Sequence, residues 1–254
     1  MSITSSPRAE SWYAGAPLVA PDWVRELGPT IVIAPHPDDE VLGCGGTMAL
    51  LRAAGIPVYI VVVSDGAASH PGSVRYPPPA LAALRQTELL AGVAHLGIAA
   101  EQVAFLGLPD GGVPLADSPD GARAVTSLGD VLRALPPFQT ALLPWRRDPH
   151  SDHRATSSLA TAALDAVSRA VRRLEYPIWA RVGPGPDDLP RPDEATLWRV
   201  DISTVSQAKR AAILAHESQT TDMIDDATIS YCLPDAVLER FAEPYELFLE
   251  VTGR

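Results

Sequence analysis

The chain contains the segment Thr30-Ile31-Val32-Ile33-Ala34-Pro35-His36-Pro37-Asp38-Asp39-Glu40, in which an apolar run ends in a histidine and a group of acidic residues. The run predicts a buried β-strand, because short continuous apolar runs are typical of strands covered on both faces. A histidine and adjacent carboxylates at the end of such a strand are costly to desolvate unless a metal, a partner or a ligand compensates them. Open α/β sheets hold their sites at the carboxyl ends of strands, so the segment predicts a functional site there.

A second cluster of the same kind lies far downstream. It reads Asp148-Pro149-His150-Ser151-Asp152-His153 and follows another apolar run, Ala141-Leu142-Leu143-Pro144. A single histidine near a helix start is more often a cap, but two histidines that flank an aspartate are typical of metal sites and general acid–base pairs. A parallel sheet would bring both strand ends to one edge, so we expect the two clusters to meet.

Strand and helix patterns alternate around these clusters, which predicts right-handed βαβ units and a mostly parallel sheet in an α/β fold. The predicted strands lie at 30–34, 57–63, 102–106 and 140–144, and the predicted helices at 42–54, 79–96, 119–135 and 154–171. Beyond residue 172 the pattern changes to strands at 172–178, 197–201 and 245–251 and a helix at 203–214. We read this part as a C-terminal extension of one domain, 30–254, preceded by an N-terminal arm, 1–29.

Composition narrows the class of partner. With 254 residues the chain can bury one large α/β core. The formal net charge of −11 argues against sequence-independent nucleic-acid binding and against docking on anionic membranes. No apolar run approaches the ~20 residues of a membrane-spanning helix, and Met1–Glu10 lacks the pattern of a secretory signal. We therefore expect a cytoplasmic protein with no nucleic-acid partner and no stable membrane insertion, while a small molecule such as a neutral sugar stays open as its partner; the oligomeric state stays unknown.

The turn Gly43-Cys44-Gly45-Gly46 invites comparison with dinucleotide-binding loops. It lacks the third glycine of that motif, and Asp65, the one candidate ribose ligand, is followed directly by Gly66, which suits a turn. Close packing of a helix beneath the acidic loop explains the glycines better. Cys44 and Cys232 form no Cys-x-x-Cys pair, so a thiolate zinc site is not expected.

In combination, the two clusters resemble the signature of the LmbE-like, or PIG-L, de-N-acetylases. His36-Pro37-Asp38-Asp39-Glu40 with Leu42-Gly43-Cys44-Gly45-Gly46 looks like the first motif, and His150-Ser151-Asp152-His153 like the second. Weaker agreements, spread over about 30–220, are Asp65-Gly66, Arg85, Glu88, Leu106–Gly111, Lys209 and His216-Glu217-Ser218-Gln219. The resemblance implies a Rossmann-like three-layer fold and a zinc-dependent hydrolase that removes the N-acetyl group from an N-acetylglucosamine-type sugar or glycoconjugate.

By motif position, the resemblance implies that one Zn²⁺ per chain is held by His36, Asp39 and His153. The same donor set serves other divalent metals such as Fe²⁺, and non-haem iron(II) oxygenases use it too. An oxygenase therefore stays open as an alternative, as does a non-catalytic carbohydrate-binding relative. The parallel α/β pattern and the adjacent base candidate Asp38 favour the hydrolase.

The resemblance also implies the catalytic roles. Asp38 would be the general base, and His150 would stabilise the oxyanion or protonate the leaving amine. Either Asp38 or His150 could supply that last proton. Asp152 would orient or electrostatically tune His150. From their positions after predicted strands, Arg85 and Asp110 are candidates for contacts to the substrate.

Overall fold

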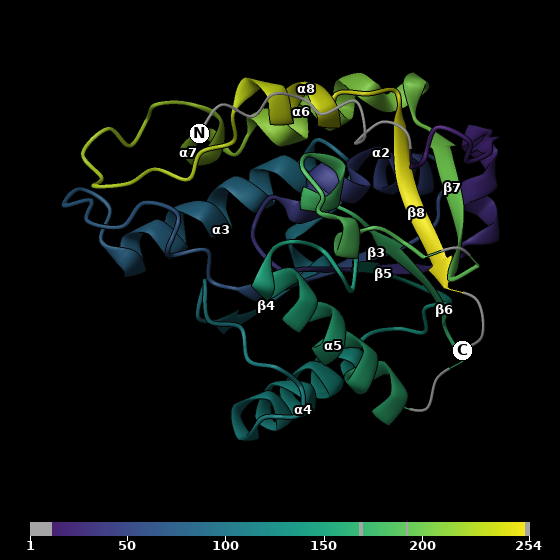
Figure 1. Ribbon diagram of the computed structural model, residues 1–254, viewed down its shortest axis with the longest axis horizontal. Helices are drawn as coiled ribbons and strands as arrows, with labels where there is room; N and C mark the ends of the chain where they lie inside the picture. The colour runs from purple at the N-terminus through teal and green to yellow at the C-terminus, as the bar shows by residue number, and fades with distance from the viewer. Residues whose placement is uncertain (1–11, 168–169, 192, 252–254) are drawn as a thin grey trace.

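The computed structural model describes residues 12–167, 170–191 and 193–251, with a central sheet between layers of helices (Figure 1). The strands lie in the order β1-β7-β8-β6-β5-β2-β3-β4. Their bounds are β1 Leu18–Val19, β2 Thr30–Ala34, β3 Val58–Ser64, β4 Val103–Leu108, β5 Thr140–Pro144, β6 Arg172–Tyr176, β7 Ala195–Asp201 and β8 Tyr245–Val251. Neighbouring strands are parallel except at β8, which is antiparallel to β6 and β7. The predicted α/β fold with a mostly parallel sheet is confirmed.

Helices cover both faces of this sheet, which gives the expected three layers. Their bounds are α2 Asp39–Ala53, α3 Pro78–Ala94, α4 Pro119–Ala134, α5 Ser151–Ala166, α6 Ser206–Leu214, α7 Glu217–Thr220 and α8 Asp235–Phe241. α2, α3 and α6 pack on one face, and α4 and α5 on the other (Figure 1). Successive residues of β2 divide between the two cores, with Val32 in the first and Ile31 and Ile33 in the second. None of the described helices is both long and apolar enough to span a bilayer.

Two helices begin earlier than the sequence pattern predicts. The helix expected at 42–54 begins at Asp39, and the helix expected at 154–171 begins at Ser151. Both acidic clusters therefore run into the first turn of a helix, where the positive end of the helix dipole favours carboxylates. The side chains of these clusters are held by regular structure as well as by loops.

The C-terminal part completes the same sheet. β8 and β7 extend it beyond β6, and β1, which was not predicted, pairs with β7. β1 falls within the predicted N-terminal arm, of which residues 1–11 lie outside the described residues. The division of the chain at residue 30 stays a prediction.

The glycines of α2 allow close helix packing. A Cβ atom at Gly43 would lie 2.4 Å from the ring of Tyr176, and one at Gly46 would lie 2.6 Å from the side chain of Ile202. The hydroxyl of Tyr176 donates to the carbonyl of Ile33 at 2.9 Å. α2 thus lies directly against β6 and the segment after β7, as the packing explanation of the glycines requires.

A buried ion pair joins the last strand to the same helix. Glu246 of β8 accepts hydrogen bonds from the backbone N–H groups of Gly46 and Thr47 at 2.7 and 2.8 Å and from Nζ of Lys209 at 2.7 Å. Glu246 is completely buried and Lys209 is 2% exposed. Burial lowers the pKa of Lys209, against the attraction of Glu246. The pair holds α2, α6 and β8 together.

Candidate metal centre

The two clusters meet at the switch point of the sheet, between β2 and β5. β3 and β4 lie on one side of β2, and β5 and β6 lie on the other, so the order of winding reverses between β2 and β5. In open α/β sheets such a point leaves a crevice at the carboxyl ends of the strands. The loops after β2 and β5 both open into it, as the sequence predicts.

Three donor groups converge in this crevice. Oδ2 of Asp39 lies 3.1 Å from Nδ1 of His36 and 3.2 Å from Nε2 of His153. One ligand atom from each residue lies within 4.8 Å of the others, as a single metal ion requires. Burial alone would raise the pKa of Asp39, but His153 and His36 outweigh it and lower the pKa.

The hydrogen bonding of His153 fits a metal ligand. Its ring is fully buried, and neither ring nitrogen has a hydrogen-bond partner among the described residues. Nε2 is close to Asp39, but not in hydrogen-bond geometry. Nδ1 lies 3.4 Å from Oδ1 of Asp148. Carboxylates in this position commonly orient the histidine ligands of metal ions.

Asp148 itself is fixed by the backbone. Its Oδ2 accepts the N–H groups of Ile178 and Trp179 at 3.1 and 2.9 Å, and the residue is completely buried. The sequence shows Asp148 at the start of the second cluster, but its role behind His153 depends on a segment thirty residues away. Sequence reasoning therefore missed it.

A second possible donor group shares His36 and adds His150 and Asp152. Here the carboxylate already accepts the N–H of Gly111 at 2.7 Å and lies 3.3 Å from Nε2 of His36. We favour the group with His153, because both nitrogens of that buried ring lack hydrogen-bond partners among the described residues. The carboxylates do not distinguish the groups, since Asp39 and Asp152 each accept a backbone N–H. The carboxylate of Asp152 is thus directed at His36, and its link to His150 runs through its backbone N–H, which donates to Nδ1 of His150 at 3.2 Å.

Asp38 has an unusual backbone conformation, with a φ of 140°. Its N–H donates to Oε2 of Glu40 at 3.1 Å, and its carboxylate accepts from Nη2 of Arg85 at 3.1 Å. Burial raises the pKa of Asp38 to about 7, although Arg85 opposes the change. Strained residues of this kind persist only where the surroundings over-determine them, and they concentrate at functional sites.

The two predicted substrate contacts both lie at this site. Arg85 is 3% exposed and also donates to the carbonyls of Pro37 and Gly66 at 2.7 and 3.0 Å. Asp110 has one oxygen 3.2 Å from Nε2 of His36. Burial would raise the pKa of Asp110, but the contact with His36 lowers it to about 2. Arg85 in this structure supports Asp38 and the loops around it, which the sequence did not suggest.

A buried histidine lies behind the site. His216 is 1% exposed, and its Nε2 is 3.7 Å from Oε1 of Glu40, the residue that holds the backbone of Asp38. Burial and the nearby Arg85 lower the pKa of His216 to about 3, so the ring is neutral. The carboxylate of Glu88 is engaged by Ser218, with the N–H at 2.7 Å and the hydroxyl at 2.6 Å. Among the weaker motif agreements, His216 thus lies beside Glu40, and Glu88 is bonded to Ser218, two residues after His216.

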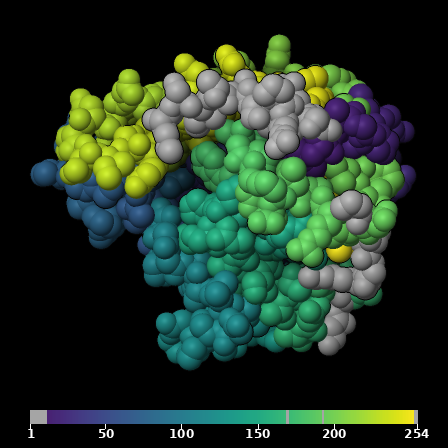
Figure 2. Space-filling model, in the orientation of Figure 1, coloured from purple at the N-terminus to yellow at the C-terminus, as the bar shows by residue number. Residues whose placement is uncertain are grey.

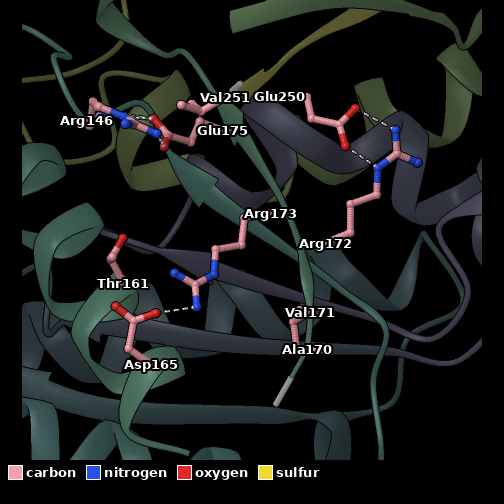
Figure 3. Close-up of a pocket in the computed structure, with 10 residues that line it drawn as sticks. All are labelled: Arg146, Thr161, Asp165, Ala170, Val171, Arg172, Arg173, Glu175, Glu250 and Val251. Atoms are coloured by element: carbon pink, nitrogen blue, oxygen red, sulfur yellow. Dashed lines mark hydrogen bonds and ion pairs between the residues drawn. The ribbon is translucent and has the colours of Figure 1, made fainter. Parts of the chain in front are cut away.

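A cavity of about 750 Å³ opens over the centre and is lined by His36, Asp38, Asp39, Arg85, Asp110 and His150. A second cavity, of about 670 Å³, lies along β6 (Figure 3). Figure 3 shows its arginines paired with carboxylates, Arg146 with Glu175, Arg172 with Glu250 and Arg173 with Asp165. Its described lining has neither histidine nor cysteine, so we place the site in the first cavity.

Comparison with known families agrees with this geometry. The profile of the family described as GlcNAc-PI de-N-acetylase, PIG-L, matches residues 31–164, over half of the chain. The chain belongs to the PIG-L family. The resemblance inferred from the two motifs is confirmed, and the matched residues of this PIG-L protein include both clusters.

Relatives of this PIG-L protein are named as deacetylases. It is 28% identical to a 1D-myo-inositol 2-acetamido-2-deoxy-alpha-D-glucopyranoside deacetylase of Mycobacteroides abscessus, over 83% of this chain and 90% of that one. It is 28% identical to a Bacillus cereus protein named "Probable N-acetyl-alpha-D-glucosaminyl L-malate deacetylase 2", over 77% and 86%. A conserved protein of Thermus thermophilus has a similar structure, with a TM-score of 0.65, 28% identity and coverage of 88% and 94%. Neither the oxygenase nor the non-catalytic alternative gains support from these relatives.

Proposed function

We propose that this PIG-L protein is a metal-dependent hydrolase that removes the acetyl group from the nitrogen of an N-acetylglucosamine-type sugar or glycoconjugate. The observation that carries the proposal is the convergence of His36, Asp39 and His153 beside a cavity, next to the carboxylate of Asp38. The names of the relatives supply the class of substrate.

The metal that we propose is Zn²⁺, one ion per chain, with Fe²⁺ as the alternative that the same donors accept. His36, Asp39 and His153 would hold it, and Asp148 would orient His153. When bound, a divalent ion supplies a Lewis acid that polarises the amide carbonyl and acidifies water. The unpartnered nitrogens of buried His153 support this assignment.

Asp38 is the proposed general base. Its carboxylate lines the cavity beside Asp39 and is fixed by the hydrogen bond from Arg85. It would take the proton from the water that attacks the amide carbon, a role that contributes about 10²–10⁴-fold to the rate. Arg85 would act as a positioning residue, because its guanidinium also ties down the loops on both sides of Asp38.

His150 is the proposed donor to the reacting amide. Its Nδ1 accepts the N–H of Asp152, so in the neutral ring the proton lies on Nε2. Donation from Nε2 would stabilise the negative charge that develops on the carbonyl oxygen. The leaving amine would take its proton from His150 or from Asp38. Asp152 would orient His150 through its backbone N–H.

Asp110 is a proposed contact for sugar hydroxyls, since it lines the same cavity. We also propose a cytoplasmic location. Both cysteines, Cys44 and Cys232, are free thiols, as is usual in a reducing compartment.

Metal content and acetate release together test the proposal. The zinc-loaded chain should release acetate from an N-acetylglucosaminide, and His153→Gln should lose both the metal and the release. The matched control is His95→Gln, because His95 is exposed on the surface. If the metal-loaded chain releases no acetate from sugar, lipid and antibiotic N-acetylglucosamine conjugates, the proposed activity is wrong.

A further inference from the structure

The cavity over the centre has one polar side and one apolar side. The residues of the candidate centre form the first. Trp179, Tyr231, Leu233 and Pro234 contribute to the second. Pockets of about 300–1,000 Å³ hold ligands of drug size, so a single sugar ring would fill only part of the 750 Å³ present here. The apolar side is therefore available for a further group of the substrate.

Backbone hydrogen bonds fix this apolar wall. The segment 222–234 lies beside the loop after β3, at the left of Figures 1 and 2, and the N–H of Tyr231 donates to the carbonyl of Ser69 at 3.0 Å. The N–H of Leu233 donates to the carbonyl of Gln219 at 2.8 Å. Trp179 is anchored to Asp148, the residue behind His153. The wall is thus positioned relative to the centre.

Tyr231 is exposed in an unusual way. It is 62% exposed, although it is a large aromatic residue that lines the cavity. An aromatic side chain at the rim of a pocket offers a ligand apolar area and a flat ring on which flat groups can stack. Ile229 belongs to the same segment and is 49% exposed, but it does not line the cavity.

The charges of the cavity disfavour an anionic group. Arg85 is the one arginine or lysine among its described lining residues, and its guanidinium already bonds to Asp38 and two carbonyls. Asp38, Asp39 and Asp110 line the same cavity. A bound divalent ion would offset the charge of two of these carboxylates, but it would lie at the polar side, so a phosphate or carboxylate placed against the apolar side would have no free cationic side chain to receive it.

We propose that the wall formed by Trp179, Tyr231, Leu233 and Pro234 is a subsite for a neutral apolar group carried by the sugar. The inference rests on the proposed function for the sugar itself. Such a group has two possible sources, a substituent at the anomeric carbon or a longer N-acyl chain. In either case a phosphate-bearing or carboxylate-bearing sugar is a poorer ligand than its apolar counterpart.

Binding of deacetylated sugars tests the subsite without turnover. Calorimetry on the zinc-loaded chain should show that phenyl and octyl glucosaminides bind roughly tenfold more tightly than glucosamine, from the apolar area that they bury. Glucosamine 1-phosphate should bind no more tightly than glucosamine. Tyr231→Ala should remove most of the gain with the phenyl compound, Tyr231→Phe should keep it, and Ile229→Ala is the matched surface control.

The position of the added apolar group, at the anomeric carbon or in the N-acyl chain, distinguishes the two sources. Tighter binding of the phenyl glucosaminide than of glucosamine places the apolar group at the anomeric carbon. Tighter binding of N-hexanoylglucosamine than of N-acetylglucosamine places it in the acyl chain. Equal binding of all neutral ligands, or tightest binding of the phosphate, overturns the subsite. Tight apolar binding without any acetate release leaves the subsite intact and contradicts the proposed function instead.

Discussion

Asp38 and Asp39 are neighbours in the chain, yet they face different partners. Asp39 is directed at His36 and His153, while Asp38 is directed at Arg85. The φ of 140° at Asp38 produces this divergence just before α2 begins. Conformations of this kind cost about 1–3 kcal/mol, and here the bonds to Glu40 and Arg85 hold the residue in place.

Replacing Asp38 by asparagine should separate metal binding from proton transfer. Asp38→Asn retains the size and an acceptor for Arg85, so the chain should still bind one zinc ion. Turnover should fall about 10²–10⁴-fold, the usual effect of losing a general base. Metal analysis and acetate release on one preparation check both statements. Loss of zinc together with activity would make Asp38 a ligand instead.

The two motifs predict which residues meet at the centre, because each motif directly follows a strand and the two strands are parallel. His36, Asp39 and His153 lie together as expected. Asp148 behind His153 and His216 behind Glu40 could not be assigned. Their roles depend on contacts between distant segments. From the sequence, a histidine that only packs in the core cannot be told from one that contacts a residue of the site.

Among the elements, α2 is the one whose sequence most directly serves the site. It carries Asp39 in its first turn and glycines in the turns that follow. These glycines lower the intrinsic stability of the helix, by about 1 kcal/mol each relative to alanine. Close contact with Tyr176 and Ile202 offsets that cost and fixes the helix start against the sheet.

Gly43→Ala should therefore destabilise the protein despite the better helix propensity of alanine. The new Cβ would lie 2.4 Å from the Tyr176 ring, and overpacking of this kind costs about 1–3 kcal/mol. Gly129→Ala in α4 is the matched control, since only the flexible end of Arg133 approaches it and the change should be neutral or stabilising. Urea unfolding of both variants measures the difference. Equal stability of the two would show that α2 can move away from β6.

The segment that carries Tyr231 should loosen in acid. Asp226 accepts the N–H of Arg75 and the hydroxyl of Ser73, and these bonds lower the pKa of Asp226 to about 2. Its folded pKa is below the unfolded value of about 3.9, so its contribution to stability is present above pH 4 and is lost as the pH falls toward 2.

Asp226→Asn should reproduce that loosening at pH 7. Amide hydrogen exchange of segment 222–234, relative to the intrinsic rate at the same pH, should be faster in the variant. The loss of protection between pH 4 and pH 2 should be smaller in the variant than in the unmodified protein. Asp222→Asn, in the same segment, is the control. Unchanged exchange in both variants would mean that other contacts hold the segment.

For the whole molecule, the strands and helices of the βαβ part could be predicted closely, since each depends on a local pattern. β2 and β5 have the predicted bounds, and β3 and β4 differ by one or two residues. The antiparallel insertion of β8 and the pairing of β1 with β7 could not be predicted. Neither has a local signal, because strand order is decided by packing between segments far apart in the chain.

Glu246 should be the most sensitive position of the extension. Glu246→Ala leaves Lys209 buried without its partner, and such a break costs about 3–5 kcal/mol. Asp130→Ala breaks an exposed pair with Arg133 in α4 and should cost less than about 1 kcal/mol. Thermal unfolding of both variants compares the two, and similar melting temperatures would contradict the assigned importance of the buried pair.

The bond between Glu246 and the backbone of α2 has a consequence for protein synthesis. Both motifs of the site are synthesised long before β8, but the buried hydrogen bonds from the backbone of α2 to Glu246 form only once β8 has been made. Domains fold as units, so a nascent chain that ends before β8 would expose the glycine face of α2 and an unpaired lysine. We therefore expect the chain to bind a metal ion only after β8 has been made, and translation products that lack β8 to be inactive.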